Sequence, residues 1–171
     1  AAIQMCKAWD CKVFATAGSK KKSEFCRQLG ADVVINYKEQ SFHEVLMKET
    51  AGKGVNVILD MIGGSYTPLH LDLLATEGRL VIINYMKGDE ATIKHSPILR
   101  KRLTITGSTL RARDIAFKSS IAEKLQNVVW PWFATGLVKP VVTKTFPLAE
   151  AAEAHRLIES GENLGKIVLV C

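Results

Sequence analysis

Short apolar segments alternate with amphipathic ones along the first 107 residues, and this alternation constrains the fold more than any other feature of the sequence. Five segments are predicted as strands: 12–17, 33–35, 55–60, 79–83 and 103–107. Runs that are apolar at almost every position are typical of strands buried on both faces, as in parallel sheets. We therefore predict an α/β fold, in which a doubly wound parallel sheet is covered by helices on both faces.

Local end signals predict the helices between these strands. The chain is expected to begin within a helix that runs through Trp9, because no capping residue precedes it. Ser19 is placed to cap the next helix, and Gly30 to end it. Ser41 and Glu44 have the spacing of a capping box, which predicts a helix from there to about residue 50.

The pattern changes after residue 107. The remaining elements are predicted as a long helical stretch, an extended segment, an Ala-rich helix and a closing strand, at 115–135, 138–146, 148–160 and 165–170. Trp130 and Trp132 in the first of these are expected to pack rather than to bind a ligand. We expect this part to be a separate structural piece, with the division at residue 115.

The net charge of +6 leaves two interpretations open. Lysines and arginines cluster only at 20–22 and 100–102, and neither cluster has interleaved aromatic residues, so binding to nucleic acid is not expected. An ordinary solvated surface accounts for the charge, and so does a pocket for a phosphorylated cofactor.

Three other classes of site are not expected. No apolar run approaches the roughly 20 residues of a membrane helix, so a membrane partner is not expected. The four cysteines, Cys6, Cys11, Cys26 and Cys171, form no C-x-x-C pair and have no histidine pair at zinc spacing, so this chain alone should not build a zinc site. Free thiols are typical of a reducing compartment, so we expect the cytoplasm, with the mitochondrial matrix left open. No histidine lies in a recognisable nucleophile motif.

The loop after the first strand points to a particular cofactor. In nucleotide-binding α/β domains an acid at this position holds the ribose hydroxyls of NAD, whereas a 2′-phosphate needs small polar and cationic groups. Here the strand is followed by Gly18, Ser19 and three lysines, with no acid. Ser19 at a helix N-terminus and Lys22 one turn later could hold that phosphate. A capped helix with solvated lysines is the alternative.

Two later loops carry weaker signals. Tyr37 follows the second strand, where it could lie against the adenosine end of a cofactor or only cover the sheet edge. Gly63 and Gly64 follow the third strand and would allow a backbone to approach a ribose, although an ordinary turn explains them equally well. Asp60 could cap this turn rather than take part in chemistry.

Taken together, these segments resemble the medium-chain dehydrogenase/reductase superfamily, in its zinc-free quinone oxidoreductase branch. The similar segments follow the family order along nearly the whole chain: AAIQMCKAW, ATAGSKKKSEFCRQLGADVVINYKEQSF, GVNVILDMIGG, GRLVIINYMKG, LRKRLTITGSTLRARD and FPLAEAAEAHRLIESGENLGKIVLV. The resemblance implies a Rossmann-like domain over residues 1–115 that lacks its first strand and glycine-rich loop. It also implies that residues 116–171 are a helical connection and the C-terminal part of a substrate domain.

The resemblance also implies roles for individual residues. NADPH would be the cofactor, a quinone or another small electrophilic acceptor the substrate, and the 103–107 strand the edge at which two subunits pair. Ser19 and Lys22 would hold the 2′-phosphate, with Tyr37 near the same end. The other implied cofactor contacts are Met61, Ile62, Tyr85, Thr109, Leu110, Arg111 and Asn163.

Two departures from the family pattern leave alternatives open. Asn84 stands where family members often have glycine, and the family's A-x-G-x-V-G loop would precede Ala1. We therefore expect these 171 residues to bind NADPH weakly or not at all by themselves, although the parent protein would be an enzyme. The alternatives are a non-catalytic dimerisation module, such as a splice product, and an alcohol dehydrogenase or enoyl reductase of the same superfamily.

Overall fold

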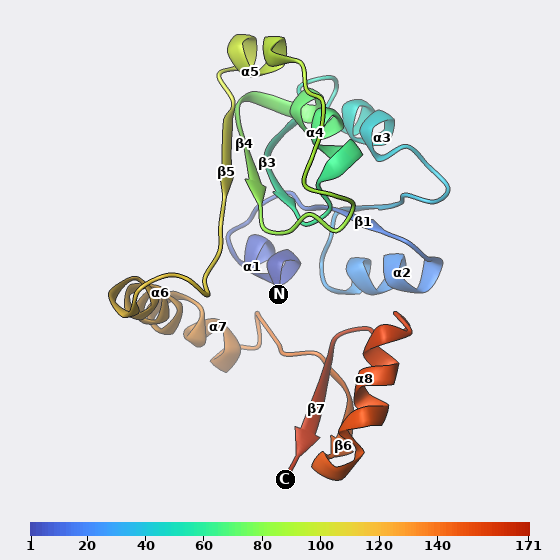
Figure 1. Ribbon diagram of the computed structural model, residues 1–171, viewed down its shortest axis with the longest axis vertical. Coiled ribbons are helices and arrows are strands. Elements are labelled where there is room, and N and C mark those ends of the chain that lie inside the picture. Colours follow the sequence, from blue (N-terminus) through green and yellow to red (C-terminus); the bar gives the residue numbers. More distant parts are fainter. The chain divides into compact units, whose positions relative to one another are not determined.

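The computed structural model describes residues 1–171, and all of its strand pairs are parallel (Figure 1). The chain forms two compact units: one combines residues 1–36 with 121–171, and the other comprises residues 37–120. The predicted α/β fold with a parallel, Rossmann-like sheet is confirmed, whereas the predicted division at residue 115 stays a prediction. No helix is long and apolar enough to cross a membrane.

The N-terminal part of the first unit follows the predicted order of elements. It consists of α1 (Ala2–Ala8), β1 (Phe14–Ala17), α2 (Lys20–Gln28) and β2 (Val33–Asn36). Strands β1 and β2 pair in parallel, from Phe14 with Val33 to Ala17 with Asn36. The hydroxyl of Ser19 accepts a hydrogen bond from the amide of Lys22, so the predicted N-cap of α2 is confirmed.

The C-terminal part of the same unit contains a second parallel pair. Its elements are α6 (Ile115–Val128), which begins in the other unit, α7 (Trp130–Ala134), β6 (Val142–Pro147), the 3₁₀ helix η2 (Leu148–Glu150), α8 (Ala151–Glu159) and β7 (Lys166–Val170). The predicted helical stretch over 115–135 consists of two helices, because it is interrupted at Val129 just before Pro131, which has no amide hydrogen to donate. Trp132 packs edge-on against Trp9, with ring centroids 5.1 Å apart, whereas Trp130 is exposed against expectation.

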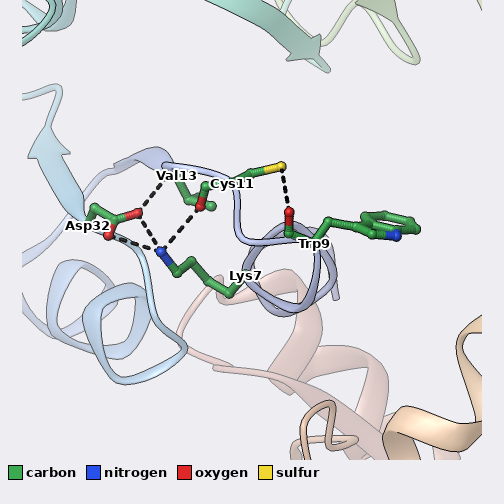
Figure 2. A network of polar contacts seen from close by, with 5 residues as sticks. All are labelled: Lys7, Trp9, Cys11, Val13 and Asp32. Atoms are coloured by element: carbon green, nitrogen blue, oxygen red, sulfur yellow. Dashed lines mark hydrogen bonds and ion pairs between the residues drawn. The ribbon is translucent and has the colours of Figure 1, made fainter.

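A polar network joins the end of α1 to the start of both strands (Figure 2). The ammonium of Lys7 donates to both carboxylate oxygens of Asp32, each at 3.0 Å, and to the carbonyl of Cys11 at 3.2 Å. The amide of Val13 donates to the same carboxylate at 2.6 Å. This amide, followed by the Lys7 ammonium, holds the pKa of Asp32 below its ordinary value of 3.8.

Asp32→Asn is therefore expected to lower the urea midpoint of unfolding at neutral pH. A carboxyl whose pKa is lower in the folded protein stabilises the fold above its ordinary value of 3.8, and this contribution disappears as the pH falls through the folded-state pKa. The difference between Asp32→Asn and the unsubstituted protein should then shrink below about pH 4. Asp89→Asn is the control, since Asp89 is exposed and makes no contact. Equal midpoints for both variants at neutral pH would contradict the account.

The second unit is built on a three-stranded parallel sheet. Its elements are α3 (Phe42–Glu49), β3 (Val55–Asp60), the 3₁₀ helix η1 (Gly64–Tyr66), α4 (Thr67–Leu73), β4 (Leu74–Ile82), α5 (His95–Lys101) and β5 (Thr104–Gly107). The sheet order is β3-β4-β5. Strand β4 begins at Leu74, earlier than the predicted residue 79, because the chain passes from α4 into the strand without a loop.

The core of this unit lies on one face of the sheet. Leu71, Leu74 and Leu80 are almost completely buried, and they pack against apolar residues that include Ile58 and Ile98. On the opposite side of β3, Val57 and Leu59 are 61% and 47% exposed. Since successive residues of a strand point to opposite faces, the helices of this unit cover only one face of its sheet.

Candidate functional site

The carboxyl ends of β3, β4 and β5 lie together at one edge of the parallel sheet. Asp60 pairs with Ile82, and Ile82 pairs with Gly107, so all three strands end in register. The three segments that continue from these ends carry six of the predicted site residues: Met61, Ile62, Tyr85, Thr109, Leu110 and Arg111. The topology therefore starts these three segments at the same edge, where ligands bind in open α/β sheets.

The segments that follow β3 and β4 are held together by backbone hydrogen bonds. The amides of Ile83, Met86 and Lys87 donate to the carbonyls of Asp60, Met61 and Ile62 at 2.8, 3.2 and 2.8 Å, respectively. The second segment also closes on itself, because the amide of Gly88 donates to the carbonyl of Tyr85 at 2.9 Å. The carboxamide oxygen of Asn84 accepts a hydrogen bond from the amide of Tyr85. We call residues 60–64 and 83–88 the paired loops.

Gly63 and Gly64 allow the paired loops to approach each other. Both have left-handed backbones, with φ of 64° and 51°. A Cβ on Gly64 would lie 2.4 Å from the carbonyl oxygen of Lys87, and one on Gly63 would lie 2.8 Å from that of Gly88. The space that these glycines leave is thus filled by the neighbouring loop, which favours a structural role for them over direct contact with a ligand.

Asp60 caps the first of the paired loops, as the sequence allowed. One carboxylate oxygen accepts hydrogen bonds from the amides of Ile62 and Gly63, at 2.7 and 3.2 Å. The other lies 3.1 Å from Nδ1 of His70, a buried residue of α4. Burial lowers the pKa of His70 below its ordinary value of 6.5, although the Asp60 charge acts in the opposite direction.

The segment that follows β5 is less constrained. Its start is fixed by the amide of Ser108, which donates to the carbonyl of Ile82 at 3.0 Å. The carbonyl of Arg111 accepts from the Lys118 ammonium, but Thr109, Leu110 and Arg111 form no hydrogen bond with the paired loops and are exposed. The structure therefore brings Met61, Ile62 and Tyr85 together. Thr109, Leu110 and Arg111 share only the sheet edge with them.

In the first unit, Ser19 and Lys22 lie at the N-terminus of α2. No acidic residue occurs in the first turn of this helix, and the Lys22 ammonium forms no hydrogen bond or ion pair. The ammonium lies 4.0 Å from the position that a Cβ on Gly161 would occupy, so the turn after α8 approaches it. A free ammonium and free helix amides are a donor set that fits a phosphate.

The two remaining predicted residues differ in how far they are free to bind. Tyr37 is exposed and follows Asn36 directly, at the end of β2. Asn163 is already engaged: its carboxamide accepts from the Thr143 hydroxyl at 2.7 Å and donates to the carbonyl of Gly165 at 2.9 Å. These bonds join the turn before β7 to β6, so any contact of Asn163 with a cofactor would use its remaining hydrogen-bonding capacity.

Sequence reasoning missed one further pair of residues beside the paired loops. The Lys87 ammonium lies 4.6 Å from the ring centroid of Tyr66, a cation–π contact that connects the second loop to η1. The residues are 21 positions apart. The only sequence signal for such a contact is the pair of glycines at 63 and 64, which allows the first paired loop to pack closely against a neighbour.

The residues of this chain do not form a metal centre. No three His, Cys, Asp or Glu side chains lie together in a way that could hold a metal ion. The chain's own residues therefore do not fit a zinc ion, and the chemistry proposed below uses none of them as metal ligands.

The chain is similar to proteins whose names describe redox enzymes. Quinone oxidoreductase of Sus scrofa is 31% identical over 175 residues, which cover 99% of this chain and 50% of that protein. The 2-haloacrylate reductase of Burkholderia sp. is 33% identical over 160 residues, covering 92% of this chain and 47% of that protein. The crystal structure of Escherichia coli quinone oxidoreductase complexed with NADPH matches with a TM-score of 0.83 and 28% identity, over 99% of this chain and 52% of that one.

The chain thus spans about half the length of these relatives. The matching family model, described as zinc-binding dehydrogenase, covers residues 29–169, and the similar structures share the partial Rossmann-like fold. The chain therefore belongs to the zinc-binding dehydrogenase family, and it corresponds to the C-terminal part of proteins of the medium-chain dehydrogenase/reductase superfamily.

Proposed function

We propose that the protein containing this chain is an NADPH-dependent reductase that transfers a hydride to a quinone or an activated alkene. The observation that carries this proposal is the N-terminus of α2, which follows the end of β1. Ser19 caps this helix, the Lys22 ammonium in its first turn has no partner, and the first turn contains no acidic residue. This donor set fits the 2′-phosphate that distinguishes NADPH from NADH. Relatives named quinone oxidoreductase and 2-haloacrylate reductase support the two classes of acceptor.

The cofactor would be held by two groups of residues. Ser19 and Lys22 would bind the 2′-phosphate, with Tyr37 against the adenosine end. The ribose and nicotinamide end would be contacted from the sheet edge and the C-terminal turn, by Met61, Ile62, Tyr85, Thr109, Leu110, Arg111 and Asn163. When bound, NADPH supplies the hydride.

The residues of the chain would contribute position rather than proton transfer. Met61, Tyr85 and Leu110 are exposed, apolar or aromatic, and follow three adjacent strand ends. Such side chains can hold an acceptor ring and exclude water from it. The hydrogen bonds within the paired loops fix the backbone that carries the first two of them. Orientation of this kind contributes a large part of the rate acceleration in reactions between two bound molecules.

We also propose a homodimer formed through the 103–107 segment. Strand β5 is the outermost strand of its sheet, and all four of its residues are exposed. An outer strand presents unpaired amides and carbonyls that a second copy could pair with. Light scattering should then give twice the monomer mass, and Ile105→Pro, which removes one edge donor, should give the monomer mass.

The test of the reductase is its choice of substrates. With the protein containing this chain, we expect loss of reduced-nicotinamide absorbance when NADPH is mixed with a quinone or a conjugated enone. Simple alcohols should not support reduction of NADP⁺. Alcohol oxidation would instead support an alcohol dehydrogenase, and preference for a thioester-linked enoyl group would support an enoyl reductase. A dimer that does not oxidise NADPH with any of the quinone, enone or enoyl acceptors would support the non-catalytic module.

A further inference from the structure

A buried carboxylate–imidazole pair lies directly below the first of the paired loops. Asp60 is 1% exposed, and both of its carboxylate oxygens are engaged. One oxygen receives the amides of Ile62 and Gly63, and the other faces Nδ1 of His70. Because burying an ionised carboxylate is costly unless it is hydrogen-bonded, the His70 contact is part of what keeps Asp60 in place.

The ring of His70 is itself held on its other sides. Phe42 of α3 and Tyr66 of η1 pack around it, with ring centroids 5.7 and 5.9 Å from that of the imidazole. Phe42 and Tyr66 also contact each other at 5.2 Å, and the Lys87 ammonium lies over the Tyr66 ring. Phe42 of α3, Tyr66 of η1 and Asp60 of β3 thus fix the orientation of one imidazole, and the second paired loop contacts Tyr66.

This orientation determines which nitrogen carries the proton. The Asp60 oxygen beside Nδ1 can only accept a hydrogen bond when the carboxyl is ionised, so Nδ1 must donate. A neutral His70 therefore carries its hydrogen on Nδ1. The chain of contacts then runs from the aromatic cluster through His70 and Asp60 to the backbone amides of the Ile62–Gly63 turn.

We propose that His70 is a positioning residue, which fixes the Ile62–Gly63 turn through Asp60 and so sets the backbone that faces the reduced nicotinamide cofactor. The positioning of the turn stands on the geometry alone, and its consequence for the cofactor rests on the proposed function. His70 itself would touch no reacting group. Its contribution is to keep one loop in the conformation that binds.

Two substitutions of similar size separate the hydrogen bond from simple packing. Asn at position 70 can place an N–H near the Nδ1 position, whereas Leu fills the space without a donor. In His70→Leu, we expect the amides of Ile62 and Gly63 to exchange with solvent about tenfold faster relative to Leu80, since a hydrogen bond to a charged group contributes roughly that factor or more. His70→Asn should restore most of the protection.

The exchange measurement is made by NMR without any cofactor, on the protein containing this chain. Unchanged protection of Ile62 and Gly63 in His70→Leu would overturn the proposal, and so would equal losses in both variants. Should His70→Leu not fold, the nitrogen chemical shifts of His70 in the unsubstituted protein provide the decision. A hydrogen on Nδ1 supports the proposal, and a hydrogen on Nε2 contradicts it.

Kinetics then separate this proposal from the proposed function. We expect His70→Leu to raise the KM for NADPH severalfold with a smaller change in kcat, and His70→Asn to stay close to the unsubstituted protein. Faster exchange at Ile62 and Gly63 together with an unchanged KM would support positioning of the turn by His70. The same result would count against the placement of this turn at the cofactor, and therefore against the proposed function.

Discussion

Gly64→Ala is expected to destabilise the protein by about 2–4 kcal/mol, because it combines backbone strain with a steric clash. The φ of Gly64 is +51°, a left-handed conformation that costs a residue with a Cβ about 1–2 kcal/mol. The added Cβ would also lie 2.4 Å from the carbonyl oxygen of Lys87. Since that contact is with backbone, the paired loops would have to separate. Equilibrium unfolding in urea measures the effect.

Gly52→Ala isolates the strain from the clash. Gly52 also has a left-handed backbone, with φ of +76°, but a Cβ there would meet nothing within 4 Å. We expect this control to lose only about 1–2 kcal/mol, the cost of the backbone conformation. If Gly64→Ala were no more destabilising than Gly52→Ala, the close packing of the paired loops would not contribute to stability, and this part of the account would be wrong.

Lys22→Ala is expected to weaken NADPH binding by roughly ten- to a hundredfold, because one charged hydrogen bond to the 2′-phosphate contributes about 1.5–3 kcal/mol. NADH lacks this phosphate, so its affinity should change little. The Lys22 ammonium has no other partner in the structure, and its loss should not disturb α2, whose cap uses the Lys22 backbone amide rather than its side chain.

Lys21→Ala is the matched control, since Lys21 is exposed in the same helix turn and its loss removes the same charge. Long-range attraction alone would make the two variants equivalent, and added salt would reduce both effects. A direct contact predicts a much larger loss of NADPH affinity for Lys22→Ala. Equal losses of NADPH and NADH affinity in Lys22→Ala would show that this ammonium does not touch the 2′-phosphate.

The helix starts could be predicted from the sequence because their signals are local. Ser19 and Ser41 each accept a hydrogen bond from the amide three residues later, as their positions indicated. The strands of the parallel sheet could be predicted equally well, because their apolar runs stand out between turn residues. The turn-capping role of Asp60 is also local, because it depends only on the amides of Ile62 and Gly63, two and three residues later in the chain.

The contacts that organise the candidate site could not be predicted in this way. His70 lies ten positions after Asp60, and Tyr66 lies 21 positions before Lys87, so no periodicity brings them together. They meet because parallel strands place the ends of β3 and β4 side by side, with α4 returning beneath them. The same holds for Lys7 and Asp32, which are 25 residues apart. Only the folded topology creates these pairs.

The break at Val129 and the early start of β4 have a different cause. Pro131 was visible in the sequence, but a proline in the first turn of a new helix and one inside a continuous helix give similar patterns. At Leu74, the strand starts at the end of α4, where the buried leucines pack against Ile58 of β3 and Ile98 of α5. In both places the tertiary context decides between two locally acceptable structures.

The relative affinity for NADPH and NADH shows whether Ser19 and Lys22 bind the 2′-phosphate. Both would be measured by calorimetric titration of the protein containing this chain, at one fixed salt concentration. We expect NADPH to bind at least about tenfold more tightly, since one charged contact to the 2′-phosphate is worth that much. Equal affinities, or tighter binding of NADH, would contradict the assignment of Ser19 and Lys22 as the phosphate site and the NADPH-dependent reductase built on it.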